Sequence, residues 1–183
     1  MEREVAECRT LFEKKTRDYG TSWRILRLPS LTDQIFIKAN RIRSIQESGE
    51  NRVGDDVRDE FVAMVNYAVM ALIQVESTER EAENEPLEKV MELYDGQTKR
   101  VLDLMMAKNH DYGEAWRQMR VSSMVDLILM KLLRIKQIED NEGRTLVSEG
   151  VEGGYMDIVN YSLFCLVRLT EEDSGKIPAI QEK

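Results

Sequence analysis

The sequence predicts an all-α protein built from two tandem three-helix units that pack against each other as an internal pseudo-dimer. The first observation is a repeat: the segment Lys-Thr-Arg-Asp-Tyr-Gly-Thr-Ser-Trp-Arg at residues 15–24 recurs as Lys-Asn-His-Asp-Tyr-Gly-Glu-Ala-Trp-Arg at residues 108–117. The second is periodicity, because apolar residues fall at helical spacing and no turn dipeptide separates two alternating runs. The third is size, since 183 residues with 42% hydrophobic content suffice for two small units that share a core.

The repeat continues past this motif and includes polar as well as apolar positions. At an offset of 93 residues the matched pairs are Arg27 and Arg120, Ser30 and Ser123, Asp33 and Asp126, Lys38 and Lys131, and Arg41 and Arg134. After a one-residue slip they are Val57 and Val151, Asn66 and Asn160, Tyr67 and Tyr161, and Leu72 and Leu166. A repeated fold requires only the apolar pattern, so the recurring polar positions indicate function. We assign 1–80 to a first helical repeat, 86–170 to a second and 171–183 to a loose C-terminal tail.

The first two helices of the first repeat have clear boundary signals. Apolar residues from Val5 to Phe12 follow helical spacing, and Gly20 is placed to end this helix in the left-handed conformation. Ser30 is expected to cap the second helix, with Asp33 three residues later as an acidic variant of the capping box.

The third helix of each repeat should be its most buried element. In the first repeat it starts within residues 55–59 and continues to Ile73, and it is apolar nearly all round. The second repeat follows the same plan, with Pro86 expected as the first helical residue of its first helix. Its three helices are expected at about 87–110, 123–139 and 151–169.

Composition excludes several classes of protein. The formal charge of −8 and the pI of about 4.9 give no electrostatic reason to expect direct binding to a nucleic-acid backbone, although they leave room for a local basic pocket. One histidine and no Cys-x-x-Cys pair argue against zinc, and Cys8 and Cys165 are expected in apolar surroundings. No run approaches the roughly 18 apolar residues of a membrane span, and the N-terminus lacks a secretory segment. We expect a cytoplasmic protein with no membrane partner.

The Lys-x-x-Asp-Tyr-Gly motif has a structural and a functional interpretation. In the structural one, glycine ends a helix, lysine pairs with aspartate, and the aromatic residues pack beneath the connector. Such an ion pair adds only about 0.2 to 0.5 kcal/mol to a helix, which does not explain its presence in both copies. In the functional one, the motif binds a ligand. His110 matches Arg17, so it has no role common to both copies.

A second repeated element is Asp-x4-Lys-x2-Arg, formed by Asp33, Lys38 and Arg41 and again by Asp126, Lys131 and Arg134. Lysine and arginine three residues apart share a helix face, and two cations on one face make a site for phosphate oxygens. The alternative is that the aspartate caps its helix and the cations extend over the core. A third element is Asn66 and Asn160, whose amides either tie helices together or bind a polar ligand edge.

Acidic residues near the start of the third helix differ between the copies. The second copy has Glu149, Glu152 and Asp157, whereas the first has Asp55, Asp56, Asp59 and Glu60. A Mg²⁺-nucleotide site requires carboxylates beside cations, since Mg²⁺ takes one or two carboxylates together with phosphate oxygens and water. The same carboxylates also suit the positive end of a helix dipole without any ligand.

With these motifs in view, the sequence resembles the first nucleotide modification associated domain family, over about Leu11–Leu72 and Leu104–Leu169. The name of that family implies a link to modified nucleotides or bases. A weaker similarity connects the chain to the MazG-like nucleoside triphosphate pyrophosphatases, which are all-α bundles that bind Mg²⁺ through acidic helix motifs. The resemblance implies a MazG-like helical bundle, but Asp157 follows Glu149-x-x-Glu152 at a different spacing from the second acidic pair of those enzymes.

The leading hypothesis is a protein that binds a nucleotide or modified nucleotide, with Mg²⁺-dependent pyrophosphate hydrolysis as its enzymatic form. In that form Glu149, Glu152 and Asp157 hold the metal, and Asp111 and Glu152 are the candidate catalytic residues. The candidate nucleotide-binding residues are Lys108, Tyr112, Trp116, Lys131, Arg134 and Asn160 in the second copy and Lys15, Asp18, Tyr19, Trp23, Lys38, Arg41 and Asn66 in the first. The alternatives are a non-catalytic nucleotide sensor or accessory to a base-modifying enzyme, and a helical scaffold. An internal pseudo-dimer is also able to pair again as a homodimer.

Overall fold

The computed structural model describes residues 1–51, 54, 56–77, 85–144 and 150–175. All regular structure in these residues is helical, which confirms the predicted all-α class. The elements are α1 (Glu2–Tyr19), η1 (Ser22–Ile25), α2 (Leu28–Ser48), α3 (Val57–Glu76), α4 (Leu87–Tyr112), η2 (Ala115–Gln118), α5 (Val121–Asp140) and α6 (Val151–Asp173), where η marks a short 3-10 helix. The order of helix, 3-10 turn, helix and helix occurs twice, as predicted for two tandem units.

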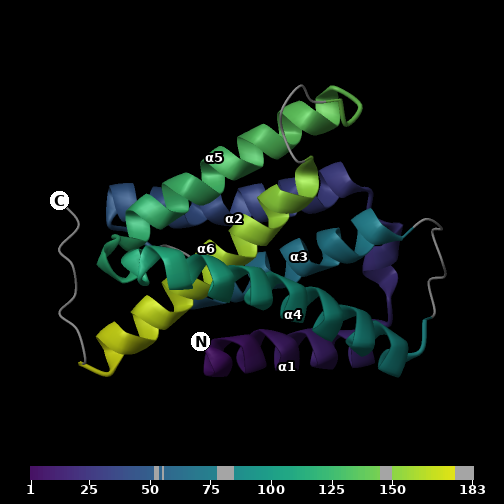
Figure 1. Ribbon diagram of the computed structural model, residues 1–183, viewed down its shortest axis with the longest axis horizontal. Coiled ribbons are helices and arrows are strands. Elements are labelled where there is room, and N and C mark those ends of the chain that lie inside the picture. Colours follow the sequence, from purple (N-terminus) through teal and green to yellow (C-terminus); the bar gives the residue numbers. More distant parts are fainter. Residues whose placement is uncertain (52–53, 55, 78–84, 145–149, 176–183) are drawn as a thin grey trace.

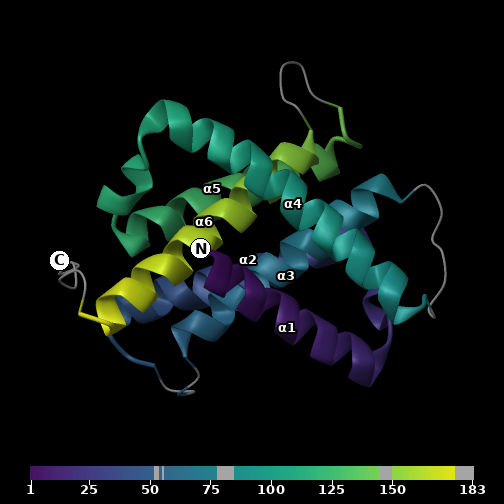
Figure 2. The same ribbon diagram turned by 60° about the horizontal axis from the view of Figure 1, so that its bottom comes forward.

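The helices form three layers, and each layer contains one helix from each repeat (Figure 1). α3 and α6 make the middle layer, α2 and α5 cover one side of it, and α1 and α4 cover the other, as Figure 2 shows from a second direction. Each middle helix contacts the other and also contacts helices of both outer layers. The two repeats therefore share a core in the manner of a dimer.

The core lies around the middle layer. More than half of the residues of α3 and of α6 are buried, whereas α1 buries only Glu4, Cys8, Phe12 and Thr16. This confirms that the third helix of each repeat is the central one. Full burial of an apolar side chain contributes about 1.5 to 3 kcal/mol, so the contact between α3 and α6 is the main attachment of one repeat to the other.

The second helix of each repeat begins earlier than predicted. α2 starts at Leu28 with Pro29 in its first turn and Arg27 as its N-cap, so the expectation that Ser30 caps this helix is wrong. Proline suits a first turn because its fixed φ is helical and its missing N–H would have no intrahelical partner there. α5 likewise starts at Val121, two residues before the predicted position.

The repeated aspartates of α2 and α5 link the two repeats instead of capping helices. Asp33 Oδ1 lies 2.6 Å from Lys136 Nζ of α5, and Asp126 Oδ1 lies 3.5 Å from Arg43 Nη1 of α2. Lys136 and Arg43 occupy matching positions of the repeat, so the same contact forms twice about the pseudo-two-fold axis. Both aspartates are more than half exposed, and pairs of this kind contribute about 0 to 1 kcal/mol.

The two glycines of the repeated motif end α1 and α4. φ is 60° at Gly20 and 61° at Gly113, and each N–H donates to the carbonyl oxygen four residues earlier at 2.9 Å. Gly113 adopts the predicted left-handed helical conformation, whereas Gly20 has a ψ of −148°, in a region open essentially to glycine alone. Glycine therefore has a structural role in both copies of the motif.

Tyr94 of α4 attaches the second repeat to the first. Its ring stacks on Phe12 of α1 with centroids 4.5 Å apart, and its hydroxyl donates to Asn66 Oδ1 of α3 at 2.8 Å. Asn66 Nδ2 in turn donates to the carbonyl oxygen of Cys8 at 3.2 Å. Asn66 is thus a structural tie among three helices, which is one of the two interpretations that its sequence position allowed.

A second buried polar cluster joins α2, α5 and α6. Thr32 Oγ1 lies 2.7 Å from both Glu139 Oε1 and the Tyr155 hydroxyl, and the Tyr155 hydroxyl donates to Glu139 Oε1 at 3.2 Å. Burial raises the pKa of Glu139, although hydrogen bonds from Thr32 and Tyr155 favour its ionised form. In the other repeat, Glu139 is matched by Gln46, Tyr155 by Phe61 and Thr32 by Val125. This cluster therefore does not belong to the repeated plan.

Three further expectations concern the ends of the chain, membranes and cysteines. α6 continues to Asp173, so the segment assigned to the tail begins in a helix, and residues 78–84 and 176–183 lie outside the described structure. None of the described helices has the length and apolar character required to cross a membrane. Cys8 and Cys165 are buried and form no disulfide within the described residues, and burial raises the pKa of the Cys8 thiol to about 12.

We predict that Tyr94→Phe lowers the free energy of unfolding by about 1 to 3 kcal/mol, because Asn66 Oδ1 loses its donor while buried. Urea denaturation measures the change. Tyr67→Phe, on α3 next to Asn66, is the control, because no described residue hydrogen-bonds to the Tyr67 hydroxyl, and it should change stability by less than about 0.5 kcal/mol. Equal losses in the two variants would contradict the role assigned to the Tyr94 hydroxyl.

We also predict a pH-dependent effect of Glu139→Gln. A carboxyl whose folded pKa is raised binds its proton more tightly when folded, so the wild type loses stability as pH rises through that pKa. Glutamine still accepts from Thr32 and Tyr155 but does not ionise. Relative to the wild type, the variant should therefore become more stable as the pH rises from about 4 to about 7. Urea denaturation midpoints at both pH values measure this difference. A constant difference across this range would show that Glu139 does not titrate as the structure implies.

Candidate functional site

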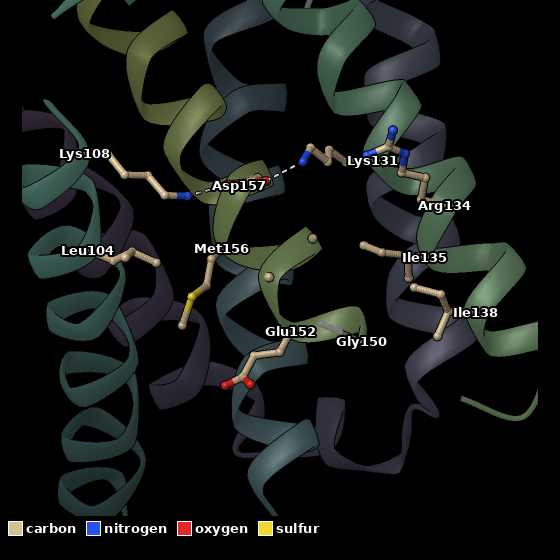
Figure 3. Close-up of a pocket in the computed structure, with 12 residues that line it drawn as sticks. Leu104, Lys108, Lys131, Arg134, Ile135, Ile138, Gly150, Glu152, Met156 and Asp157 are labelled. Atoms are coloured by element: carbon tan, nitrogen blue, oxygen red, sulfur yellow. Dashed lines mark ion pairs between the residues drawn. The ribbon is translucent and has the colours of Figure 1, made fainter. Parts of the chain in front are cut away.

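A pocket of about 440 Å³ lies between α4, α5 and α6 of the second repeat (Figure 3). Its polar lining comes from Lys108 of α4, Lys131 and Arg134 of α5, and Glu152 and Asp157 of α6. Its apolar lining is Leu104, Ile135, Ile138 and Met156, and Gly150, Gly153 and Gly154 complete the wall. The pocket thus gathers three predicted nucleotide-binding cations and two predicted metal ligands of the second copy, and its volume is in the range of small-molecule sites.

One carboxylate serves the two lysines of this pocket. Lys131 Nζ lies 2.5 Å from Asp157 Oδ2, and Lys108 Nζ lies 3.6 Å from Asp157 Oδ1 (Figure 3). Arg134 forms no ion pair with any described residue, and it projects from α5 beside Lys131. The three cations are therefore only partly neutralised, which makes a locally positive pocket in a chain whose formal charge is −8.

The matching cations of the first repeat are both paired with one carboxylate. Lys38 Nζ lies 3.0 Å from Glu60 Oε2, and the Arg41 guanidinium donates to Glu60 Oε1. Glu60 belongs to α3 and is 8% exposed. Allowing for the one-residue slip, its position in the second repeat is that of Gly154, which has no side chain to place on Lys131 or Arg134.

Close helix packing explains the glycine at position 154. A Cβ atom there would lie 2.8 Å from Ile135 Cγ1 and 2.9 Å from Ile135 Cδ1, so any side chain would displace Ile135 of α5. Contacts this short are essentially never found for real Cβ atoms. The pocket is therefore open at the point where the first repeat is closed by Glu60.

Glu152, predicted as a metal ligand and catalytic residue, is held in an ion pair. Its carboxylate accepts from Arg100 of α4, which also binds Glu76. At the matching positions of the first repeat, Arg58 of α3 donates to Glu7 of α1, so the same pair occurs with its charges exchanged. This symmetry indicates that Glu152 links α4 to α6, a role that the sequence did not suggest.

The two predicted Mg²⁺ ligands that the structure describes, Glu152 and Asp157, line the same pocket and are both paired with protein cations. Asp157 is bound by two lysines and Glu152 by Arg100, while Glu149 lies outside the described residues. Within the described ranges there is no group of three His, Cys, Asp or Glu side chains that would hold a metal ion. In the described structure the two carboxylates that line the pocket are thus engaged by protein cations, and Mg²⁺ binding stays a prediction.

Trp116 lies beneath other side chains and does not line the pocket. Phe164 of α6 stacks on it with ring centroids 4.3 Å apart and an interplanar angle of 4°, and Arg117 Cζ lies 4.5 Å from its ring centroid. Because Trp116 is only 6% exposed, stacking on a nucleotide base would require one of these neighbours to move. The side chain of Tyr112, the other predicted stacking residue, lies outside the described structure.

The aromatic residues of the first copy surround a different pocket, of about 500 Å³, between α1, η1 and α3. Lys15, Tyr19 and Trp23 line it together with Phe12, Tyr67 and Met70. Met70 occupies the position of Phe164 in the second copy. The structure thus separates the first-copy candidates: Lys15 and the aromatic residues share this pocket, whereas Lys38 and Arg41 are bound to Glu60.

The motif aspartates and the second buried asparagine line neither pocket. Asp111 is exposed, with His110 Nδ1 at 3.3 Å, and Asp18 is exposed as well. The i, i+3 pairing of the motif lysine and aspartate is not seen at either copy among the described residues. Asn160 is buried like Asn66, but no described group hydrogen-bonds to its Oδ1.

Sequence reasoning missed the decisive residues at positions 60 and 154. Glu60 was noted among the acidic residues of the first copy but was given no site role, because its match is a glycine and it lies outside the repeated set. The signal that would have found it is the mismatch itself, since an acidic residue opposite a glycine changes the charge available to Lys38 and Arg41. The apolar wall formed by Leu104 and Met156 carried no signal beyond ordinary helical spacing.

The comparisons with known proteins agree with the duplicated architecture. The sequence model of the family described as nucleotide modification associated domain 1 matches the chain twice, at residues 15–75 and 108–169. These matches together span more than half of the chain and coincide with the two structural repeats. Neither a curated protein nor a solved structure matches it. The chain therefore belongs to the nucleotide modification associated domain 1 family and contains that domain twice.

Proposed function

We propose that this protein binds a nucleotide, standard or modified, through its phosphate groups in the pocket of the second repeat. The observation that carries the proposal is the difference between the copies: Arg134 has no counter-charge among the described residues, whereas Glu60 covers Arg41. An arginine that lines a pocket without a counter-charge is suited to phosphate, because its planar fork donates two parallel hydrogen bonds to anionic oxygens.

The other cations extend the same role. Lys131 and Lys108 approach Asp157 from different helices, so this carboxylate orients both ammonium groups toward the pocket (Figure 3). With a single carboxylate between them, the two lysines retain positive charge for a ligand. The apolar side chains of Leu104, Ile138 and Met156 supply a wall against the less polar part of the ligand.

Binding without hydrolysis is the form of the proposal that the described contacts support best. Its support is that Glu152 and Asp157 are engaged by protein cations, as shown by their ion pairs. Such a protein is a nucleotide sensor or an accessory to an enzyme that modifies bases. The Mg²⁺-dependent pyrophosphatase implied by the MazG-like resemblance is the competing proposal, and it requires these carboxylates to exchange their lysine and arginine partners for a metal.

We predict that Arg134→Ala weakens the binding of deoxynucleoside triphosphates by about 10- to 150-fold, the effect of removing roughly 1.5 to 3 kcal/mol of charge-assisted hydrogen bonding. Isothermal titration calorimetry at low ionic strength measures the affinity. The matched control is Arg41→Ala, whose guanidinium is already bound to Glu60 and which should leave nucleotide affinity unchanged within about threefold. Comparable losses in both variants, or none in either, would refute the assignment of the site to the second repeat.

We further predict that nucleotide binding persists in EDTA and is not weakened by it, because the proposed contacts are protein cations that interact directly with phosphate oxygens. The same titration with Mg²⁺ and with EDTA tests this, while pyrophosphate release is recorded on the same samples. Turnover that requires Mg²⁺ and disappears in Glu152→Ala would decide for the pyrophosphatase instead.

A further inference from the structure

Glu60 binds two cations from a neighbouring helix at once. One of its carboxylate oxygens is 3.0 Å from Lys38 Nζ and the other accepts from the Arg41 guanidinium, and the side chain is largely buried between α2 and α3. Both cations belong to the element that recurs in the second repeat as Lys131 and Arg134. The geometry at Glu60 therefore shows how an anionic group bridges this pair of side chains.

We propose that Glu60 occupies an anion subsite of the first repeat, and that the matching subsite beside Gly154 receives one phosphate group of the ligand, bridged by Lys131 and Arg134. This inference rests on the proposed function of the second repeat and adds the position of one phosphate to it. It also sets the number of ligands. Because Glu60 fills the subsite of the first repeat, a chain that contains the motif twice binds one nucleotide.

Chemistry and covalent attachment both favour this assignment. Carboxylate and phosphate present anionic oxygens that accept the same charge-assisted hydrogen bonds from lysine and arginine. Glu60 is attached to α3, so its effective concentration at the subsite is in or above the millimolar range and a free anion does not displace it. The first repeat accordingly keeps its cations neutralised in the absence of any ligand.

The second repeat lacks such an internal occupant because Gly154 has no side chain. A Cβ atom there would lie 2.8 Å from Ile135 Cγ1, so a side chain at this position would require Ile135 to shift. Asp157, one turn later on α6, reaches Lys131 at 2.5 Å but forms no ion pair with Arg134. In the second repeat, an external anion beside Gly154 bridges Lys131 and Arg134. Glu60 makes the matching bridge in the first repeat.

The test counts pyrophosphate ions bound per chain, by calorimetry on the full chain. The wild type should bind one, and Arg134→Ala should remove it. Glu60→Ala should bind two, because the carboxylate that bridges Lys38 and Arg41 is then removed from the subsite, and the double variant Glu60→Ala with Arg41→Ala should return to one. Glu60→Gln is the matched control, since its amide still fills the subsite, and it should bind one. If Glu60→Ala fails to fold, Glu60→Ser enters the same comparison.

The outcomes separate this inference from the function on which it rests. One ion bound by the folded Glu60 variant as well as by the wild type, or a second ion that survives Arg41→Ala, would overturn the inference while leaving the second-repeat site intact. No ion bound by the wild type, but one bound by Glu60→Ala and lost on Arg41→Ala, would overturn the proposed function and support the role of Glu60. No binding by any folded variant would overturn both.

Discussion

Charges placed against the shared core must be balanced, and this requirement shapes both repeats. The contact between α3 and α6 buries the apolar faces of both repeats, so cations at its edge lie partly out of water. An uncompensated charge in such surroundings is costly, and removing one partner of a buried pair is strongly destabilising. The repeats meet the requirement with the same cations but with different carboxylates, Glu60 in one and Asp157 in the other.

Each repeat has one ion pair between its first and third helices. The two pairs show that either helix is able to carry the positive charge while the pair stays neutral. Glu7 with Arg58 and Arg100 with Glu152 occupy matching positions with opposite polarity. Neither pair leaves a cation without a partner. Beside Gly154, Arg134 is exposed and has no counter-charge among the described residues, and for that reason we place the ligand there.

Helical periodicity and the internal repeat were sufficient to predict the class, the helix order, the central position of the third helices and the glycine helix ends. Ser30 failed as a cap because the preference of Pro29 for a first turn outweighs that of serine for an N-cap, and the sequence contained both signals. For the site, Lys108, Lys131 and Arg134 line one pocket, and their role in binding stays a prediction. Trp116 does not line this pocket, because Phe164 stacks on it from a different helix.

The sequence by itself determined that two similar helical units are joined in one chain and which polar residues recur in both, since these properties follow from spacing along the chain. Only the tertiary structure decided what each polar residue does. Asp33 pairs across the repeats, Asn66 ties three helices, and Glu60 closes a subsite that Gly154 leaves open. The physical reason is that these roles depend on side chains brought together from distant helices, at distances that no local pattern encodes.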